Sequence, residues 1–273
     1  MIEYFLNLYT NLFAKRIFAK LNKFIFLAGA RGLGILNFRT ENQSGELPFL
    51  KKYLLKFDSK DYTILDIGAN IGEFALGVFK FTKNIKIISF EPNPLAIDKL
   101  SKNLSFYSDR HKIIKKGLSN QASDSKIYDF KNENATQGFA TIHKEVLEEI
   151  FQSNDITSNN IELVSLDSQI DQFKNNVCLL KIDTEGNEKN ILIGAKKFLR
   201  EYEPEIILLE FNEMNIYSGT HFNDLKIILG DRYLPYRLLP GGDLLPMSNL
   251  TPLYSELYAY QNIVFLNKSS YIK

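Results

Sequence analysis

The stretch ILDIGANIG at residues 64–72 decides the fold of this chain. It begins as a short, mainly apolar run typical of a strand, and Gly68 and Gly72 then form a turn that opens a helix. The stretch SFEPNP at residues 89–94 follows one element later, where a second apolar strand ends in the carboxylate of Glu91. A glycine turn lets a ligand approach the backbone, and an acid at the tip of the next strand can accept both hydroxyls of a ribose. Together the two stretches predict a nucleoside-binding crevice in an α/β sheet.

Length and composition limit the classes of protein that the chain can belong to. Its 273 residues, of which 45% are apolar, suffice for one large domain or a domain with an appendage. A formal net charge of +1 gives no electrostatic footprint for nucleic acid, so we expect no such partner. The single cysteine, Cys178, excludes an internal disulfide framework and a multi-cysteine zinc site. It sits in the apolar run 177–180 and is interpreted as a buried structural thiol.

Strand and helix patterns alternate along most of the chain. Apolar runs predict seven strands, at about 63–67, 85–90, 112–115, 177–182, 205–210, 233–238 and 262–266. Helical patterns occupy about 72–81, 94–105, 187–200 and 222–229. Continuous apolar runs such as 206–209 indicate strands that are buried on both faces, as in a parallel sheet between two helix layers. The order predicts a doubly wound, mostly parallel α/β sheet.

The chain divides into an extension and a main domain. We assign residues 1–45 to an amino-terminal helical extension and connector, and residues 46–273 to the main domain. Residues 119–176 form a polar insertion between the third and fourth strands, with a helical stretch near 143–151 and an extended piece near 161–166. A polar insertion at this place is interpreted as a substrate-facing cap and not as a separate domain.

The extension carries apolar residues at helical spacing and predicts one amphipathic helix over residues 2–28. The longest apolar piece, 24–28, is far shorter than the ~20 residues of a membrane span, so the cytoplasm is the expected compartment. Packing on the main domain or on a second copy is the first interpretation. Peripheral membrane contact is the alternative, because the polar face is basic. The glycine cluster at 29–34 is expected to be a turn.

The first turn departs from the dinucleotide pattern. Dinucleotide folds carry G-x-G-x-x-G, because the pyrophosphate rests on a helix amino terminus. Here Asn70 replaces the second glycine, and Glu73 stands beside the expected phosphate position, where it would repel an anion. The departure favours a nucleoside ligand without phosphate, such as S-adenosylmethionine, whose cationic groups tolerate acids. Asp66 is then a candidate to orient the amino-acid part of that ligand.

Carboxylates gather where the fourth and fifth strands end. The stretch LKIDTEGNE at 180–188 delivers Asp183 and Glu185 to the carboxyl edge of the sheet, and the next strand ends in Glu210. Carboxylates placed this closely can share a proton, hold a cation or a sulfonium, or act as a general base. The alternative is structural: Thr184 caps the next helix, and the acids favour its positive end.

Four motifs resemble one known family when they are taken together. They are DIGANIG at 66–72, FEPNP at 90–94, KIDTEG at 181–186 and LEF at 209–211. The combination resembles the FkbM-type methyltransferases, a branch of the class I S-adenosylmethionine-dependent enzymes, over roughly residues 32–266. The resemblance implies a seven-stranded Rossmann-like sheet whose last strand runs antiparallel. It also implies methyl transfer to oxygen, mostly to a hydroxyl of a sugar or another secondary metabolite.

The resemblance also implies roles for individual residues. Gly68, Asn70 and Gly72 would approach the methionine part, Glu91 would bind the ribose, and the turn at 117–119 would border the adenine. The full cofactor-binding set that we predict is Asp66, Gly68, Ala69, Asn70, Gly72, Glu91, Pro92, Gly117, Leu118 and Asp183.

Methyl transfer to oxygen needs an aligned hydroxyl and a base that takes its proton. The candidate catalytic residues are Asp183, Glu185, Glu210 and His143. His143 lies in the insertion, whereas His111 begins a strand and His221 precedes a helix. Asp183 and Glu210 with a substrate diol would also suit Mg²⁺, so this cofactor stays open and we assign no metal ligand.

The sequence therefore predicts an S-adenosylmethionine-dependent O-methyltransferase that acts on a small molecule or glycan. An N-methyl acceptor and a homo-oligomer stay open. The alternatives are an NAD-type oxidoreductase, which the missing central glycine disfavours, and a non-catalytic scaffold that binds a nucleoside.

Overall fold

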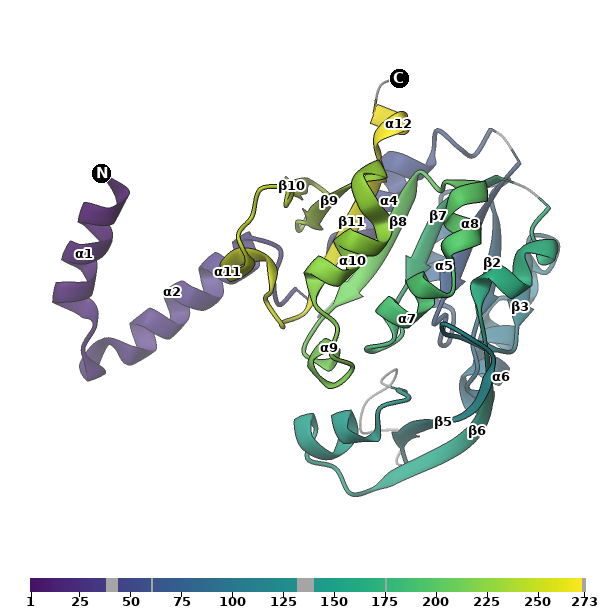
Figure 1. Cartoon of the computed structure of the whole chain (residues 1–273), viewed down its shortest axis with the longest axis horizontal. Helices are drawn as coiled ribbons and strands as arrows, with labels where there is room; N and C mark the ends of the chain where they lie inside the picture. The colour runs from purple at the N-terminus through teal and green to yellow at the C-terminus, as the bar shows by residue number, and fades with distance from the viewer. Residues whose placement is uncertain (38–43, 60, 132–139, 175, 272–273) are drawn as a thin grey trace.

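The computed structural model describes residues 1–37, 44–59, 61–131, 140–174 and 176–271. An eight-stranded sheet forms its centre (Figure 1). In spatial order the strands are β10 (Leu244–Pro246), β9 (Tyr233–Leu238), β11 (Gln261–Asn267), β8 (Ile206–Phe211), β7 (Asn176–Ile182), β1 (Tyr62–Ile67), β2 (Lys86–Phe90) and β3 (His111–Ile114). The five strands from β8 to β3 are parallel, and β11 runs antiparallel to both β8 and β9. The predicted α/β class and the antiparallel last strand are confirmed.

All seven predicted strands are present, and β10 is an eighth. It has only three residues and pairs with the edge strand β9. Three residues are too few to show the alternation by which a strand is recognised, so the sequence gives no signal for it.

Helices cover both faces of the sheet. One face holds α4 (Glu46–Leu54), α5 (Glu73–Phe79) and α6 (Pro94–Asn103), and the other holds α7 (Glu188–Ile193), α8 (Lys196–Tyr202) and α10 (Phe222–Leu229). Successive residues of β1 serve opposite faces: Ile64 packs with the first set and Leu65 with the second. Burial on both faces explains the continuous apolar runs of the central strands.

Apart from two helices at the amino terminus, the remaining helices of the described residues are short. They are α9 (Met214–Tyr217), α11 (Pro252–Ser255), α12 (Lys268–Tyr271), a π-helical turn at Val146–Ile150, and 3₁₀ turns at Arg16–Phe18, Ser105–Tyr107, Leu166–Gln172 and Gly230–Arg232.

One predicted helix, over 187–200, is divided into α7 and α8 at Gly194. A Cβ added to Gly194 would lie 2.2 Å from the carbonyl oxygen of Ser119. The carbonyl of Gly194 also accepts a hydrogen bond from the N–H of Asp167. The helix therefore ends where another part of the chain contacts its backbone, which no local pattern records.

The insertion forms a second, three-stranded sheet together with β4 (Gly117–Leu118), which directly precedes it; the order is β4, β6 (Ile156–Val164) and β5 (Ser123–Phe130). β5 and β6 form an antiparallel hairpin that lies below the main sheet in the view of Figure 1. The helical turn at Val146–Ile150 falls in the stretch predicted as helical, and strand β6 overlaps the predicted extended piece only over residues 161–164. β5 was not predicted, because polar residues dominate its sequence SDSKIYDF. Residues 132–139 of the insertion lie outside the described residues.

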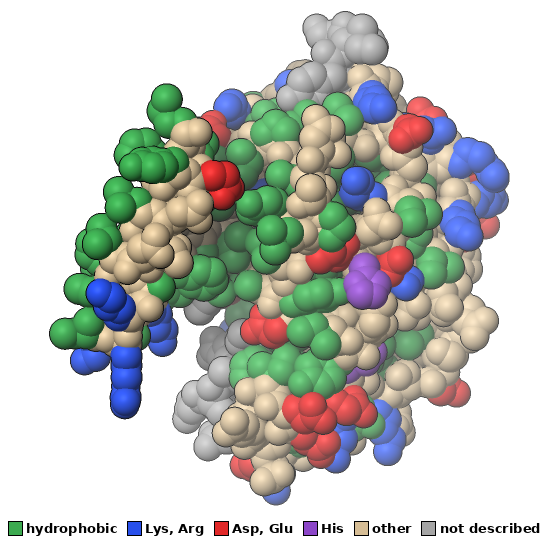
Figure 2. Space-filling view, turned by 60° about the vertical axis from the view of Figure 1, so that its left-hand side comes forward, with side chains coloured by type: hydrophobic (Ala, Val, Ile, Leu, Met, Phe, Trp, Pro, Cys, Tyr) green, Lys and Arg blue, Asp and Glu red, His purple; other side chains and the backbone are tan. Residues whose placement is uncertain are grey.

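The amino-terminal extension differs from the prediction. Two helices replace the single expected one: α1 (Ile2–Phe13) and α2 (Ala19–Gly32), which project away from the main sheet (Figures 1 and 2). The chain turns at Lys15, and the side-chain amide of Asn22 donates to the carbonyl oxygen of Phe13 at the end of α1. The expected packing on the main domain is not seen, since no residue of either helix is buried.

The glycine cluster at 29–34 was expected to be a turn. Gly29 and Gly32 instead belong to α2, and the turn begins only at Leu33. The connector predicted to follow falls partly on residues 38–43, outside the described residues. Along the part of the chain that is described, no helix combines the length and the apolar character needed to span a bilayer.

Candidate active site

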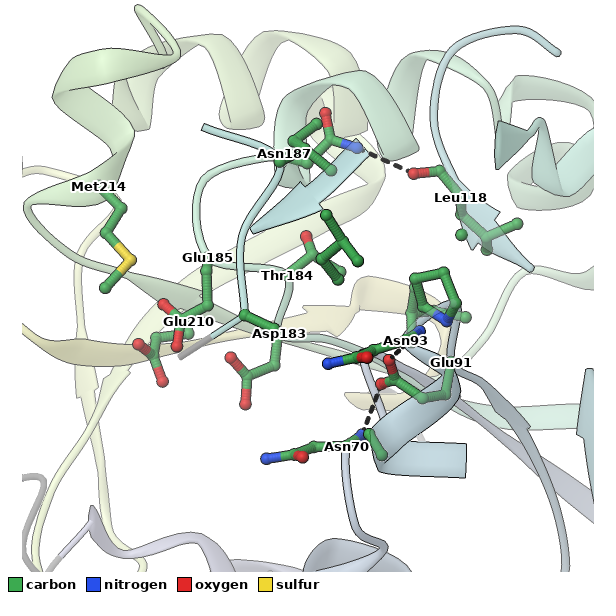
Figure 3. Close-up of a pocket in the computed structure, with 18 of the residues that line it drawn as sticks. Asn70, Glu91, Asn93, Leu118, Asp183, Thr184, Glu185, Asn187, Glu210 and Met214 are labelled. Atoms are coloured by element: carbon green, nitrogen blue, oxygen red, sulfur yellow. Dashed lines mark hydrogen bonds between the residues drawn. The ribbon is translucent and has the colours of Figure 1, made fainter. Parts of the chain in front are cut away.

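A cavity of about 460 Å³ opens at the carboxyl ends of β1, β2, β7 and β8 (Figure 3). The loops after these strands form one wall, and the insertion forms the other. This is the place where an open parallel sheet binds ligands, because the connections on either side leave a crevice there.

The turn after β1 forms the floor of the cavity. Gly68 has φ +79°, and a Cβ there would lie 1.8 Å from the carbonyl oxygen of Asp183, so only glycine allows this close approach. Asn70 is also left-handed, with φ 47°, a conformation that asparagine tolerates. Both residues line the cavity, as predicted. A Cβ on Gly72 would instead lie 2.7 Å from Leu100, so this glycine serves the packing of α5 against α6.

Glu91 lies beside this turn at the end of β2, and its side chain is almost fully buried. One carboxylate oxygen accepts the N–H of Asn70 at 2.7 Å, and the other accepts the N–H of Asn93 at 2.8 Å. Burial raises the pKa of Glu91 to about 7, and these two hydrogen bonds partly oppose the shift. A carboxylate offers about four acceptor positions, so each oxygen keeps capacity for a ligand hydroxyl.

The next part of the wall is apolar and closely packed. Pro92, Gly117 and Leu118 line the cavity as predicted, and a Cβ on Gly117 would lie 2.5 Å from a side-chain carbon of Leu163. The side-chain amide of Asn187 donates to the carbonyl oxygen of Leu118 at 2.9 Å and so holds this segment against the loop after β7. A flat, apolar slot of this kind suits a purine ring.

The insertion supplies the opposite, apolar wall. The residues that it contributes are Ile127, Ala140, Ile142, Phe151, Ile161 and Leu163. Polar contacts that join the insertion to the main domain include two near the cavity: Asn93 donates to Asp129 at 3.3 Å, and the hydroxyl of Thr141 donates to the carbonyl oxygen of Glu185 at 3.1 Å. The insertion therefore faces the cavity, as its position in the sequence suggested.

An acidic cluster lies across the cavity from Glu91. Asp183, Glu185 and Glu210 each place a carboxylate oxygen within 4.8 Å of the others. The side-chain amide of Asn212 bridges two of them, donating to Glu210 at 2.6 Å and to Glu185 at 3.2 Å. Burial is the main reason that the pKa of both glutamates is raised well above the usual range, and the negative charge of Asp183 is the second. The two glutamates therefore retain protons more readily than solvated carboxylates do.

A buried cation supports this cluster from inside the sheet. The ammonium of Lys181 lies 2.8 Å from Asp183 and 4.0 Å from Asp66, and both Lys181 and Asp66 are buried. Burial raises the pKa of Asp66 to about 6, although the charge of Lys181 opposes the shift. Lys181 therefore lies between Asp66, inside the sheet, and Asp183 of the acidic cluster.

Not every predicted site residue borders the cavity. Among the described residues, the lining includes Gly68, Asn70, Glu91, Pro92, Gly117, Leu118, Asp183, Glu185 and Glu210, but not Asp66, Ala69, Gly72 or His143. His143 packs beside Gly186, and burial lowers the pKa of its imidazole, which favours the neutral ring.

Glu188, the third acid after β7, has a structural role. One of its oxygens accepts the N–H and the hydroxyl of Thr184 and the N–H of Gly186, and the other accepts the amide of Asn215. The side chain is fully buried. Glu188 therefore folds the loop that presents Asp183 and Glu185 to the cavity.

Sequence reasoning missed many residues of the cavity and its surroundings, among them Lys181, Asn187, Asn212, Met214 and Tyr260. Asn212 and Met214 follow the motif around Glu210, and their proximity to that acid was the available signal. Tyr260 lies just before the last strand and gave no signal.

Fold and site together define a Rossmann-like protein with a nucleoside-binding crevice. More particularly, residues 66–238 match the methyltransferase FkbM domain, and the chain belongs to that family. A curated relative is the methyltransferase sdnD of Sordaria araneosa, which is 30% identical over 156 residues. The match covers 48% of this chain and 60% of the relative, so the chain spans about three fifths of that protein's length.

Solved structures give weaker likenesses. The methyltransferase FkbM from Methylobacillus flagellatus KT has a TM-score of 0.46 at 18% identity, over 75% of this chain and 43% of that one. An O-methyltransferase from Bacillus cereus, solved in complex with SAH, has a TM-score of 0.43 at 12% identity, over 96% of each chain.

Proposed function

We propose that this protein transfers a methyl group from S-adenosylmethionine to a hydroxyl oxygen of a sugar, glycan or other secondary metabolite. One observation carries the proposal: a single cavity joins a nucleoside-binding end around Glu91 to a pair of proton-retaining carboxylates, Glu185 and Glu210. Membership of the FkbM family supports the same reaction.

The residues present fit S-adenosylmethionine, which supplies the methyl group when it is bound. Glu91 keeps free acceptor positions for the two ribose hydroxyls, and Leu118 with Pro92 offers an apolar surface for the purine. Asp183 lies between Glu91 and the other two acids of the cluster, Glu185 and Glu210, where its carboxylate attracts an ammonium or a sulfonium (Figure 3). Glu73 opens α5, where a dinucleotide would place its pyrophosphate, and its charge disfavours that ligand.

The acidic cluster is suited to receive the proton of the acceptor. Asn212 holds Glu185 and Glu210 together, and their raised pKa values make the ionised member of the pair a stronger base than a solvated carboxylate. A positioned base contributes about 10²–10⁴-fold to such a reaction. Asp183 has its charge compensated by Lys181, which suits it to binding rather than to proton transfer. We therefore assign the base to the Glu185–Glu210 pair.

The three carboxylates leave a divalent cation as a second interpretation. Their spacing allows each to give one oxygen to a common ion, and hard cations such as Mg²⁺ prefer carboxylate ligands. Methyl transfer that continues in the presence of a strong chelator would remove this interpretation.

Calorimetric titration with S-adenosylhomocysteine and with NAD tests the proposal. Micromolar binding of S-adenosylhomocysteine and no binding of NAD are expected for the wild type. Glu91→Gln should weaken binding at least tenfold, because the amide replaces one acceptor oxygen with a donor. Glu162→Gln is the control, because Glu162 lies on β6 and forms an exposed ion pair with Lys116. Binding of NAD alone would overturn the proposal.

A panel of sugars and other hydroxyl compounds with radiolabelled methyl donor then tests turnover. A labelled ether product is expected with at least one acceptor. Binding of S-adenosylhomocysteine without any labelled product would favour the non-catalytic scaffold, and a labelled amine would move the reaction to nitrogen.

A further inference from the structure

The N-terminal elbow, by which we mean residues 1–37, exposes an unusual amount of apolar surface. Thirteen of its large apolar side chains are between 43% and 98% exposed. They are Met1, Ile2, Tyr4, Phe5, Leu6, Leu8, Leu12, Ile17, Leu21, Phe24, Ile25, Phe26 and Leu33. Exposed apolar residues scattered singly need no explanation, but a contiguous set on one element marks an interaction surface.

The elbow has a defined shape. The hydroxyl of Tyr9 donates to the side chain of Asn22, and the amide of Asn22 donates to the carbonyl oxygen of Phe13 at 2.9 Å. The ring of Phe13 stacks on Tyr9 and meets Phe18 edge-on. Polar groups therefore join α1 to α2 at the bend, while most large apolar side chains point outward (Figure 2).

The elbow is also attached firmly to the body. Ile35 pairs with Gln261, and the N–H of Leu36 donates to the carbonyl oxygen of Tyr260 at 2.8 Å. The side chain of Asn37 donates to the carbonyl oxygen of Arg31 at 2.9 Å, which ties the end of α2 to the same place.

Charge separates the elbow from the rest of the molecule. Five of the 33 Lys and Arg residues lie in residues 1–37, whereas only one of the 32 Asp and Glu residues, Glu3, does. The elbow thus carries a net charge of +4 and the remainder of the chain −3. Its basic residues are Lys15, Arg16, Lys20, Lys23 and Arg31, of which four lie at or close to the bend.

We propose that the N-terminal elbow docks on a membrane surface that contains anionic lipids. Two short helices with outward apolar side chains and a cluster of basic residues have the properties of helices that lie in the interface plane. At 12 and 14 residues they are too short to cross a bilayer, which takes about 20. Anionic headgroups complement a charge of +4, whereas the elbow of a second copy repels it.

Docking has a geometric consequence for the cavity. Leu36, at the end of the elbow, and Tyr260, to whose carbonyl oxygen the N–H of Leu36 donates, both line the cavity. The rim of the cavity therefore lies beside the attachment point of the elbow, and the membrane would lie on that side of the protein.

Sedimentation of the full chain with lipid vesicles tests the proposal. Wild-type protein is expected to bind vesicles of phosphatidylcholine mixed with phosphatidylserine, and to bind phosphatidylcholine alone at least tenfold more weakly. Lys20→Gln with Lys23→Gln should lower binding about fivefold per lysine at low salt. Phe5→Ser with Phe24→Ser should lower it at least tenfold, because both rings are more than half exposed.

Two variants on the body serve as matched controls. Phe106→Ser removes a ring that is 92% exposed on the main body, and Lys196→Gln with Lys197→Gln removes two exposed charges from α8. Neither should change vesicle binding.

Several results would overturn the proposal. They are equal binding to both vesicle types, no binding to either type, and equal losses in the elbow and control variants. A wild type that is dimeric without vesicles and becomes monomeric in Phe5→Ser with Phe24→Ser would assign the surface to a second copy. None of these readouts depends on methyl transfer.

Discussion

The buried ammonium of Lys181 lies 2.8 Å from a carboxylate oxygen of Asp183, two residues further along the chain. Residues two apart on a strand share one face, so the cation sits directly behind the acid that borders the cavity. A buried charge is tolerated only when it is paired, and this pair joins the interior of the sheet to the site.

Removing the cation tests this relationship. Lys181→Met leaves Asp66 and Asp183 without their partner, and we expect the free energy of unfolding to fall by about 3–5 kcal/mol. Lys189→Met is the matched control, because Lys189 pairs with Asp224 at the same 2.8 Å while both side chains stay partly exposed. This control should cost less than about 1 kcal/mol. Chemical denaturation measures both, and equal losses would contradict the role of burial.

Neutralising one member of the glutamate pair should separate activity from stability. Burial raises the pKa of Glu210, so its ionised form costs folding free energy above the ordinary pKa of a glutamate. Glu210→Gln should therefore raise the free energy of unfolding at pH 8, on the order of 1 kcal/mol, and the gain should vanish below pH 4.5. If the pair is the base, kcat should fall about 10²–10⁴-fold.

Glu205→Gln provides the comparison for that experiment, because Glu205 lies just before the same strand and pairs with Lys56 at the surface. It should leave both kcat and stability nearly unchanged. Full activity in Glu210→Gln would assign the base elsewhere.

The pH dependence of ligand binding should report on Glu91. Its pKa is raised to about 7, and only the ionised form offers acceptors on both oxygens. Affinity for S-adenosylhomocysteine should therefore fall as the pH drops below about 7 and level off above it. The stability of the free protein should change in the opposite sense, declining between pH 4.5 and about 7 as the carboxyl ionises in its buried position. Titrations of wild type and Glu91→Gln across this range measure the effect, which the variant should lack.

Two glycines with similar backbone angles should respond differently to alanine. Gly68 and Gly219 have φ +79° and +62°, so alanine is strained at both. Only at Gly68 would the added Cβ meet another segment, 1.8 Å from the carbonyl oxygen of Asp183, whereas Gly219 has nothing within 4 Å. We expect Gly219→Ala to cost about 1–2 kcal/mol. Gly68→Ala should cost more than about 3 kcal/mol, from the same strain plus overpacking. Thermal melts of the two variants decide this, and similar melting temperatures would contradict it.

The main sheet could be predicted from sequence because its central strands are buried on both faces. Runs such as 206–209 are continuous in apolar residues for that physical reason, and glycines and acids mark where the strands end. The short strand β10 and the polar strand β5 lack both signals, and the division of α7 from α8 depends on a contact with Ser119.

The residues of the candidate site that could be predicted are those that belong to a local sequence motif. Gly68, Asn70, Glu91, Asp183, Glu185 and Glu210 stand at strand ends and do line the cavity. Ion pairs and hydrogen bonds between residues far apart in the chain give no local sequence pattern, so they were not predicted. Asp66 and Lys181 are 115 residues apart, and Lys181 occupies a position in an otherwise apolar strand. The amide of Asn212 reaches Glu185 from 27 residues away.

The place where the insertion joins the sheet has a consequence for how this protein can diversify. Leu118 pairs with Val164, and the N–H of Ser119 bonds to the carbonyl oxygen of Val164 at 2.9 Å, so the two ends of the piece 119–164, which makes up most of the insertion, lie side by side. A continuous piece of the gene between them can be exchanged for another of different length without moving β3 or β7. The layout is modular. Glu91 and the acidic cluster lie outside this piece, whereas the residues of the opposite wall lie within it. A change confined to this piece would alter the opposite wall of the cavity and leave Glu91 and the acidic cluster in place.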